Sequence, residues 1–178
     1  RKGILYKNRK DLNQYNQDLA VKTEGRLLSD AMENSDVFIG VSGANLLDED
    51  HVKLMAKNPI IFALANPDPE ILPSKAHAIR DDIVMATGRS DFPNQVNNVL
   101  GFPFLFRGAL DAQATEITND MLLAASFALA KLAKEPVPQL VLDAYKTNTM
   151  EFGRDYLIPK PFDPRLIEWV ATAVKEAY

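Results

Sequence analysis

The sequence predicts an α/β protein with a parallel, doubly wound sheet that is followed by a group of helices. Three short apolar runs predict the strands, at residues 36–42, 60–66 and 83–87. Strands that alternate with helices need crossover connections, which are right-handed and bring the strands into parallel order. After residue 97 the apolar residues recur at helical spacing, so the helical part is expected to follow the sheet.

The strands and the helices between them are marked by their boundary residues. The run at 36–42 is nearly continuous, as is typical of a parallel strand covered on both faces. An extended segment at 3–6 and a helix over about 18–33 are expected before it. Asp48 is expected to cap the next helix and Asn58-Pro59 to end it. Pro67 and Gly88 then close the second and third strands, with a helix around 74–80 between them.

The second part of the chain is expected to hold four helices, at residues 97–112, 119–134, 138–146 and 164–177. Thr118 can cap the second of these. Pro164 is expected at the first position of the last helix, where its missing N–H costs nothing.

Composition limits the classes of partner. The 178 residues are 47% hydrophobic and 25% charged, which is typical of a globular chain with room for one α/β domain. A net charge of -4 argues against nucleic acid and membrane surfaces as partners. The sequence has no Cys and no apolar run near the roughly 20 residues of a membrane helix, so we predict a cytoplasmic protein. Because the chain begins with Arg1, it is expected to be part of something longer.

Ligands of open parallel sheets bind beyond the carboxyl ends of the strands. Ser42-Gly43 follows the first strand as a small turn, which would let a cofactor approach the backbone. Asn66 ends the second strand, and its amide can hold a nicotinamide ribose or a substrate carboxylate without adding charge. A tight turn without a ligand explains either position as well.

The loop after the third strand, residues 88–98, is the densest polar group of the chain. Asn94, Gln95, Asn97 and Asn98 lie just before an apolar helical run, where amides and free N–H groups can bind an anion such as a small dicarboxylate. An Asn-rich loop that only caps its helix is the alternative.

Several other patterns carry no site. His51 and His77 are predicted to be solvated surface residues without the spacing of a zinc motif. Asp48, Glu49 and Asp50 are predicted to form a first helical turn rather than a metal site. No strand is followed by the glycine-rich cradle that binds a pyrophosphate.

Taken together, the sequence resembles the malic enzymes, particularly the shorter bacterial and archaeal type. The matching stretches run in family order over nearly the whole chain: Arg1-Lys2-Gly3-Ile4-Leu5-Tyr6, Asp36-Val37-Phe38-Ile39-Gly40-Val41-Ser42, Phe62-Ala63-Leu64-Ala65-Asn66-Pro67, Ala86-Thr87-Gly88-Arg89-Ser90-Asp91, Pro93-Asn94-Gln95-Val96-Asn97-Asn98-Val99 and Phe106-Arg107-Gly108-Ala109-Leu110-Asp111.

This resemblance implies that residues 1–112 are the second half of a Rossmann-like NAD(P)-binding domain whose first βαβ unit is missing, and that residues 113–178 are a helical extension. It implies a cofactor contact by Asn66, while the cofactor contacts of Ser42 and Gly43 are expected from their place after the first strand. It also implies substrate contacts by Asn66 and the Asn97-Asn98 pair.

The activity implied is that of an NAD- or NADP-dependent decarboxylating malate dehydrogenase, an oxidoreductase that converts malate to pyruvate and carbon dioxide. The family's catalytic Tyr and Lys and its ligands for Mg or Mn are expected upstream of Arg1, so no catalytic or metal residue is assigned in this chain. The isolated chain is expected to be inactive, and the full-length enzyme is expected to be a homodimer.

Two other readings remain open at this point. One is a noncatalytic nucleotide-binding or assembly module, and the other is a different two-domain dehydrogenase. The choice between NAD and NADP also stays open, because the residue that reads the ribose 2′ position is expected before the chain begins.

Overall fold

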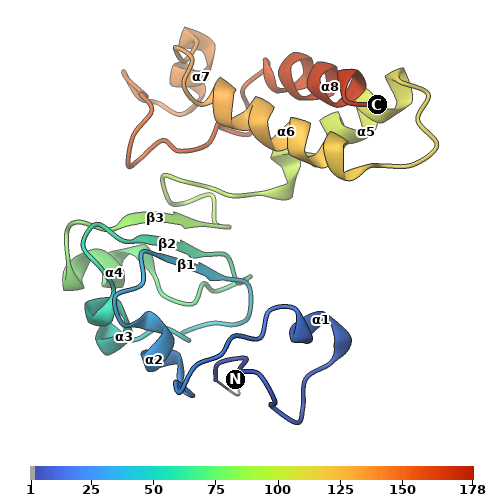
Figure 1. Cartoon of the computed structure of the whole chain (residues 1–178). Coiled ribbons are helices and arrows are strands. Elements are labelled where there is room, and N and C mark those ends of the chain that lie inside the picture. Colours follow the sequence, from blue (N-terminus) through green and yellow to red (C-terminus); the bar gives the residue numbers. More distant parts are fainter. Residues whose placement is uncertain (1–2) are drawn as a thin grey trace. The chain divides into compact units, whose positions relative to one another are not determined.

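The computed structural model describes residues 3–178 and divides into two compact units, one that ends at Val84 and one from Met85 to Tyr178. Residues 1–2, where the matching stretches begin, lie outside the described part. The elements are α1 (Gln14–Gln17), α2 (Leu28–Met32), β1 (Val37–Gly40), α3 (Glu49–Leu54), β2 (Ile60–Ala63), α4 (Pro73–Ile79), β3 (Val84–Thr87), the 3-10 helix η1 (Asn98–Leu100), α5 (Phe102–Asp111), α6 (Asn119–Leu132), α7 (Gln139–Ala144) and α8 (Leu166–Glu176) (Figure 1).

The predicted parallel sheet is confirmed. β1 and β2 pair in parallel, from Val37 opposite Ile60 to Gly40 opposite Ala63. The strand order is β1-β2-β3, with α3 between the first two strands along the chain and α4 between the second and third (Figure 1). This order places the carboxyl ends of β1 and β2 side by side.

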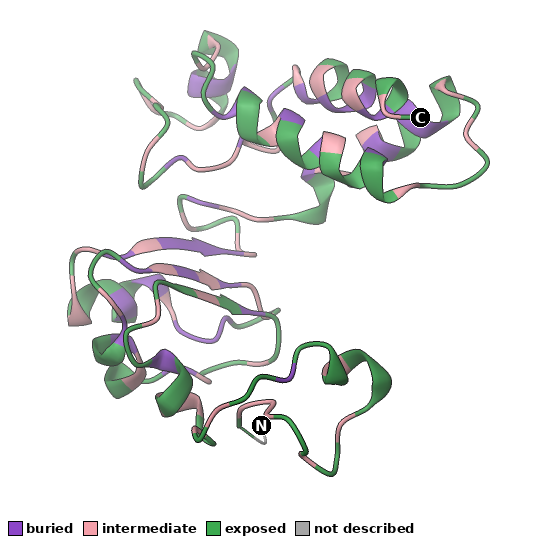
Figure 2. Ribbon diagram, in the orientation of Figure 1, coloured by how far each residue is buried: buried purple, intermediate pink, exposed green. Residues whose placement is uncertain are grey.

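β1 is shorter than predicted and is not covered on both faces. Val37 and Ile39 are 49% and 63% exposed, while Gly40 at the end of the strand is buried (Figure 2). The apolar run therefore predicted the strand correctly but not its burial. No described residue covers the side of β1 that carries Val37 and Ile39.

The helix predicted over about residues 18–33 is only partly right, because it forms as α2 over Leu28–Met32 and does not extend back to residue 18. Val21 forms a parallel bridge with Tyr6, and the Ile4 N–H donates to the Arg26 carbonyl, so this part of the segment is extended. Asp30 explains why the helix starts late, because its carboxylate accepts the N–H groups of Arg26 and Leu27. Side-chain bonds of this kind compete with helical bonds and favour a helix start.

α3 begins where Asp48 predicts it. The Asp48 Oδ1 accepts the His51 N–H at 3.0 Å. The His51 ring is also held there, with Nδ1 2.7 Å from Asp48 Oδ1 and a side chain only 19% exposed. His51 is therefore part of the cap rather than a solvated residue as predicted, whereas His77 is exposed.

Arg80 and Asp82 fix the end of α3 and the turn into β2. The Arg80 guanidinium donates to the Met55 and Ala56 carbonyls at 3.1 and 2.9 Å. Its Nε also donates to Asp82 Oδ1 at 2.6 Å, and Asp82 Oδ2 accepts the Asn58 N–H at 2.7 Å. Hydrogen bonds from Arg80 and from the Asn58 N–H lower the pKa of Asp82.

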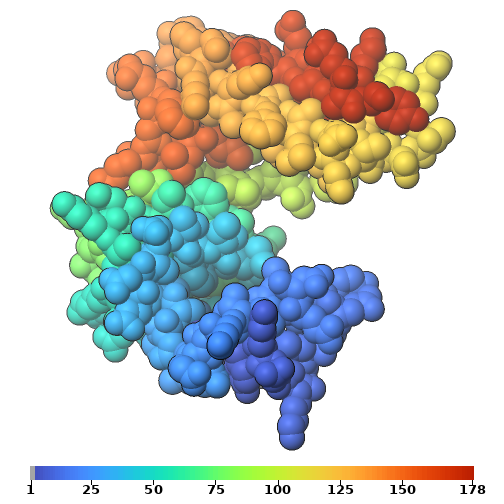
Figure 3. Space-filling view, viewed as in Figure 1, coloured from blue at the N-terminus to red at the C-terminus, as the bar shows by residue number. Residues whose placement is uncertain are grey.

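The second unit contains an apolar core between α5, α6 and α8. α8 packs against both other helices (Figure 1), and Figure 3 shows its surface beside that of α6. Gly108 permits the close contact between α5 and α8, because a methyl group there would lie 2.5 Å from the Ala171 carbonyl oxygen. The buried core residues are Leu100, Leu105, Ala109, Met121, Ala125, Ala128, Leu132, Leu166, Val170 and Val174.

The helix ends of this unit are partly as predicted. Thr118 caps α6, as predicted, by accepting the Met121 N–H at 3.2 Å. The predicted helix at 97–112 is broken into η1 and α5 around Gly101. Pro164 precedes α8 instead of starting it. Asp163, two residues before the Arg165 N-cap position, accepts the Arg165 N–H at 3.0 Å.

The division after Val84 falls earlier than the predicted domain boundary at 112/113. α5 belongs to the helical core through Leu105 and Ala109. The two predicted domains stay a prediction, since compactness alone does not define them.

Candidate functional site

The turns after β1 and β2 lie at the ends of two paired strands. Ser42 is exposed and Gly43 half-exposed after β1, and Asn66 is exposed after β2. The ladder extends one bond beyond the strands, because the Leu64 N–H donates to the Gly40 carbonyl at 2.9 Å. Ser42, Gly43 and Asn66 therefore lie close to one edge of the sheet in the first unit, as the crevice rule predicts.

One buried carboxylate connects these turns. Glu70 is fully buried, its Oε1 accepts the Ser42 N–H at 2.9 Å, and its Oε2 accepts the Ala65 N–H at 3.1 Å. The Glu70 carbonyl also accepts the Leu47 N–H at 3.0 Å. A single residue thus fixes the backbone directly after both strands.

Glu70 was not identified as a site residue from the sequence, although Gly40 carries a signal for it. A glycine inside a strand often marks the close approach of another group. A methyl group on Gly40 would lie 2.4 Å from the Glu70 Cδ, so only glycine leaves room for the carboxylate. The partner of Gly40 is 30 residues away along the chain and cannot be found from the pattern alone.

Asn66 carries an exposed side-chain amide. The Asn66-Pro67 peptide bond is cis, and the side chain is exposed. Over residues 3–178 its amide makes no hydrogen bond to another described residue. Its donors and acceptor are therefore available to a ligand, whereas the backbone beside it is held through Ala65.

Asn94, in the loop after β3, has a different role. Its side chain is 2% exposed, and Nδ2 donates to the Met85 carbonyl at 2.9 Å and to the Arg154 carbonyl at 2.6 Å. Its Oδ1 accepts the Leu157 N–H at 2.8 Å. The expectation that the amides of this loop face an anion is thus wrong for Asn94, which joins three backbone segments.

Asn97 and Asn98 are both exposed. The Asn97 Oδ1 caps η1 by accepting the Val99 N–H at 3.0 Å, which is the capping role foreseen as the alternative. Its Nδ2 makes no described bond, and neither does the Asn98 amide within residues 3–178. A substrate contact by this pair stays a prediction.

Charged groups in this loop and beside it contact residues of the loop. Arg89 donates to Asp91 through Nε and Nη2, at 2.8 and 2.7 Å, and this bond lowers the pKa of Asp91. Lys160 donates to the Pro93 carbonyl, and burial lowers the pKa of its ammonium group.

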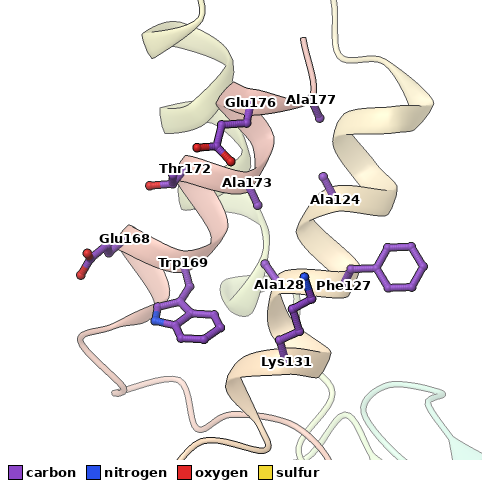
Figure 4. Close-up of a pocket in the computed structure, with 10 residues that line it drawn as sticks. All are labelled: Ala124, Phe127, Ala128, Lys131, Glu168, Trp169, Thr172, Ala173, Glu176 and Ala177. Atoms are coloured by element: carbon purple, nitrogen blue, oxygen red, sulfur yellow. The ribbon is translucent and has the colours of Figure 1, made fainter.

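Other features of the described residues do not add to this site. A groove of about 490 Å³ between α6 and α8 is lined by residues that include Phe127, Lys131 and Trp169 and none of the predicted site residues (Figure 4). Residues 3–178 contain no group of three His, Asp or Glu side chains that could hold a metal ion. In the same range, no helix combines the length and apolarity needed to cross a membrane.

An open parallel sheet with small and polar turns at its carboxyl edge is the architecture of nucleotide-binding α/β domains. Within this class, the chain belongs to a specific family: the family model described as malic enzyme, NAD binding domain, matches residues 1–142.

Similar proteins are named as malic enzymes of both cofactor types. The chain is 58% identical over 177 residues to the NADP-dependent malic enzyme of Halomonas elongata, covering 99% of this chain and 42% of that protein. It is 48% identical to the NAD-dependent malic enzyme of Rhizobium meliloti over 98% of this chain and 23% of that protein.

The fold is also that of a solved malic enzyme. The crystal structure of the NAD-dependent malic enzyme of Thermotoga maritima aligns with a TM-score of 0.81 and 40% identity, covering 98% of this chain and 43% of that one. The chain thus spans less than half the length of these relatives.

Proposed function

We propose that this chain is the dinucleotide-binding part of an enzyme that oxidises and decarboxylates malate to pyruvate and carbon dioxide while it reduces NAD or NADP. The family match over residues 1–142 carries the proposal. The exposed amides and turns at the strand ends support it, because they offer hydrogen bonds without charge where ligands of such sheets bind.

In this proposal Ser42, Gly43 and Asn66 contact the dinucleotide. Asn66, Asn97 and Asn98 contact the substrate, whose carboxylates can accept hydrogen bonds from their amides. Bonds of this kind to a charged group are stronger than bonds between neutral groups, so a few amides suffice to orient a dicarboxylate.

The resemblance implies that the ligands of the family's divalent metal, Mg or Mn, lie outside this chain. We therefore assign it no ligand here. We further propose that the full-length enzyme is a cytoplasmic homodimer and that residues outside this chain choose between NAD and NADP.

The test is malate-dependent reduction of NAD and of NADP, followed by absorbance, with the full-length enzyme and with the isolated chain. We expect the full-length enzyme to reduce at least one dinucleotide and the isolated chain to reduce neither. The reason is that the metal ligands and proton-transfer groups are proposed to lie outside this chain. Inactivity of the full-length enzyme with both dinucleotides would refute the proposed function. Activity of the isolated chain would refute the assignment of these groups outside it.

A further inference from the structure

Glu70 is the one fully buried acidic side chain in the described first unit, and its surroundings are unusual for a charge. Both carboxylate oxygens accept backbone N–H groups, from Ser42 at 2.9 Å and from Ala65 at 3.1 Å. None of the ion pairs found among residues 3–178 includes Glu70. Among the described residues, its carboxyl oxygens are therefore satisfied by the backbone of the two turns alone.

Such an arrangement is a poor way to gain stability. Burying an unpaired carboxylate costs free energy, and an apolar side chain of similar volume is often at least as stabilising. Gly40 adds to the cost, because a glycine within a strand is less favourable than a residue with a side chain. The contact between Glu70 and Gly40 is therefore better explained by the backbone segments that it positions than by a gain in stability.

What it holds are the two turns at the strand ends. A carboxylate is acceptor-only, with its two oxygens in a fixed plane, so it sets the positions of two N–H groups relative to each other. Those N–H groups belong to Ser42 and to the residue before Asn66. The backbone is directed inward at Ser42 and Ala65, while the side chains of Ser42 and Asn66 stay exposed.

We infer that Glu70 is a positioning residue that fixes the turns after β1 and β2 in the arrangement that binds the dinucleotide. The inference rests on the proposed function. Glu70 does not touch the ligand in this account. It acts by removing the freedom that Ser42 and Asn66 would otherwise lose on binding, which strengthens binding by preorganisation.

The test uses the full-length enzyme with two variants that disturb the same contact from opposite sides. Glu70→Gln replaces one accepting oxygen by an amide donor that faces an N–H group. Gly40→Ala keeps the carboxylate but adds a methyl group 2.4 Å from the Glu70 Cδ. Matched controls are Glu33→Gln, an exposed glutamate of the same unit, and Gly153→Ala, where the nearest atom lies at 3.9 Å.

Equilibrium titration with NAD and with NADP is the first readout, because it does not depend on malate turnover. We expect both variants to weaken binding of the preferred dinucleotide about tenfold, as loss of a charge-assisted hydrogen bond does. The KM for malate should rise by a smaller factor. The double variant should bind the dinucleotide no more weakly than the weaker-binding single variant, because both substitutions act on one contact. Both controls should bind as the wild type does.

A lowered melting temperature with unchanged dinucleotide affinity in either folded variant would overturn the inference and leave Glu70 a purely structural residue. This result is distinct from failure of the proposed function, in which the wild type itself does not oxidise malate.

Hydrogen exchange of the wild type decides the matter if neither variant folds. We expect the Ser42 and Ala65 amides to exchange slowly and to be slowed further, together, when the dinucleotide is added. Exchange at these two amides that ignores the dinucleotide would overturn the inference.

Discussion

The turns after β1 and β2 and the loop after β3 use asparagine in opposite ways. In the first unit the backbone is held by the Glu70 carboxylate, so the Asn66 amide remains exposed and makes no described hydrogen bond. In the second unit Asn94 itself holds the backbone and is buried. An amide at the end of a strand is therefore available to a ligand only where another group satisfies the backbone around it.

The largest effect on stability is expected at Asn94. Replacement by Ala removes three hydrogen bonds, to the Met85 carbonyl, the Arg154 carbonyl and the Leu157 N–H. The Asn94 side chain is buried, and each hydrogen bond contributes about 0.5–1.5 kcal/mol, so we expect a loss of roughly 3 kcal/mol in the free energy of unfolding. Denaturant unfolding of the full-length enzyme measures it.

Asn97→Ala is the matched control for Asn94→Ala. It removes a single capping bond to the Val99 N–H and should cost about 1 kcal/mol. If the two variants lose the same stability, the distinction between a buried structural amide and an exposed one does not hold in this loop.

Asn98 gives a smaller effect whose sign is informative. If its amide holds a malate carboxylate, Ala should lower kcat/KM roughly tenfold, and Asp should lower it further by repelling the dianion. At an ordinary helix start the order reverses, because Asp is favourable near the positive end of the helix dipole. Malate kinetics and thermal melts of both variants distinguish the two. If the Asp variant has both a higher kcat/KM and a higher melting temperature than the Ala variant, Asn98 is not part of the substrate site.

The smallest effect is expected at Asp82, which lies just before β3, away from the carboxyl ends of the strands. Its pKa is lowered in the folded protein by hydrogen bonds from Arg80 and from the Asn58 N–H. A lowered folded-state pKa contributes stability above the unfolded value of about 4, and this contribution is lost as the pH falls through the acid range. Asp82→Asn should thus be less stable than the wild type at neutral pH, and the difference should shrink in acid. A difference that does not depend on pH would show that the ion pair contributes nothing.

The sequence predicted the features that depend on local pattern. The three strands follow from apolar runs, and the caps by Asp48 and Thr118 follow from residue type at a helix start. The helix predicted over about 18–33 forms only over Leu28–Met32. The spacing of the apolar residues did not show that Asp30 accepts the N–H groups of Arg26 and Leu27 and so delays the helix start.

Features that join distant parts of the chain could not be predicted in this way. Glu70 meets Ser42 across 28 residues, and Asn94 meets Leu157 across 63. Both are polar residues in polar surroundings of the sequence, and their burial arises only when the strands pair and the loops pack. Asn94 and Asn98 lie in the same amide-rich stretch of the sequence. Residue type and position therefore could not distinguish the buried structural amide from the exposed one.

The most direct test of this account is Asn66→Ala in the full-length enzyme, measured for both kcat/KM and melting temperature. Loss of a hydrogen bond to a charged group is worth about 1.5–3 kcal/mol, so kcat/KM for malate should fall about tenfold to a hundredfold. The melting temperature should not change, because the exposed amide makes no described hydrogen bond within residues 3–178. Unchanged malate kinetics with a lowered melting temperature would contradict the account and make Asn66 part of a turn without a ligand.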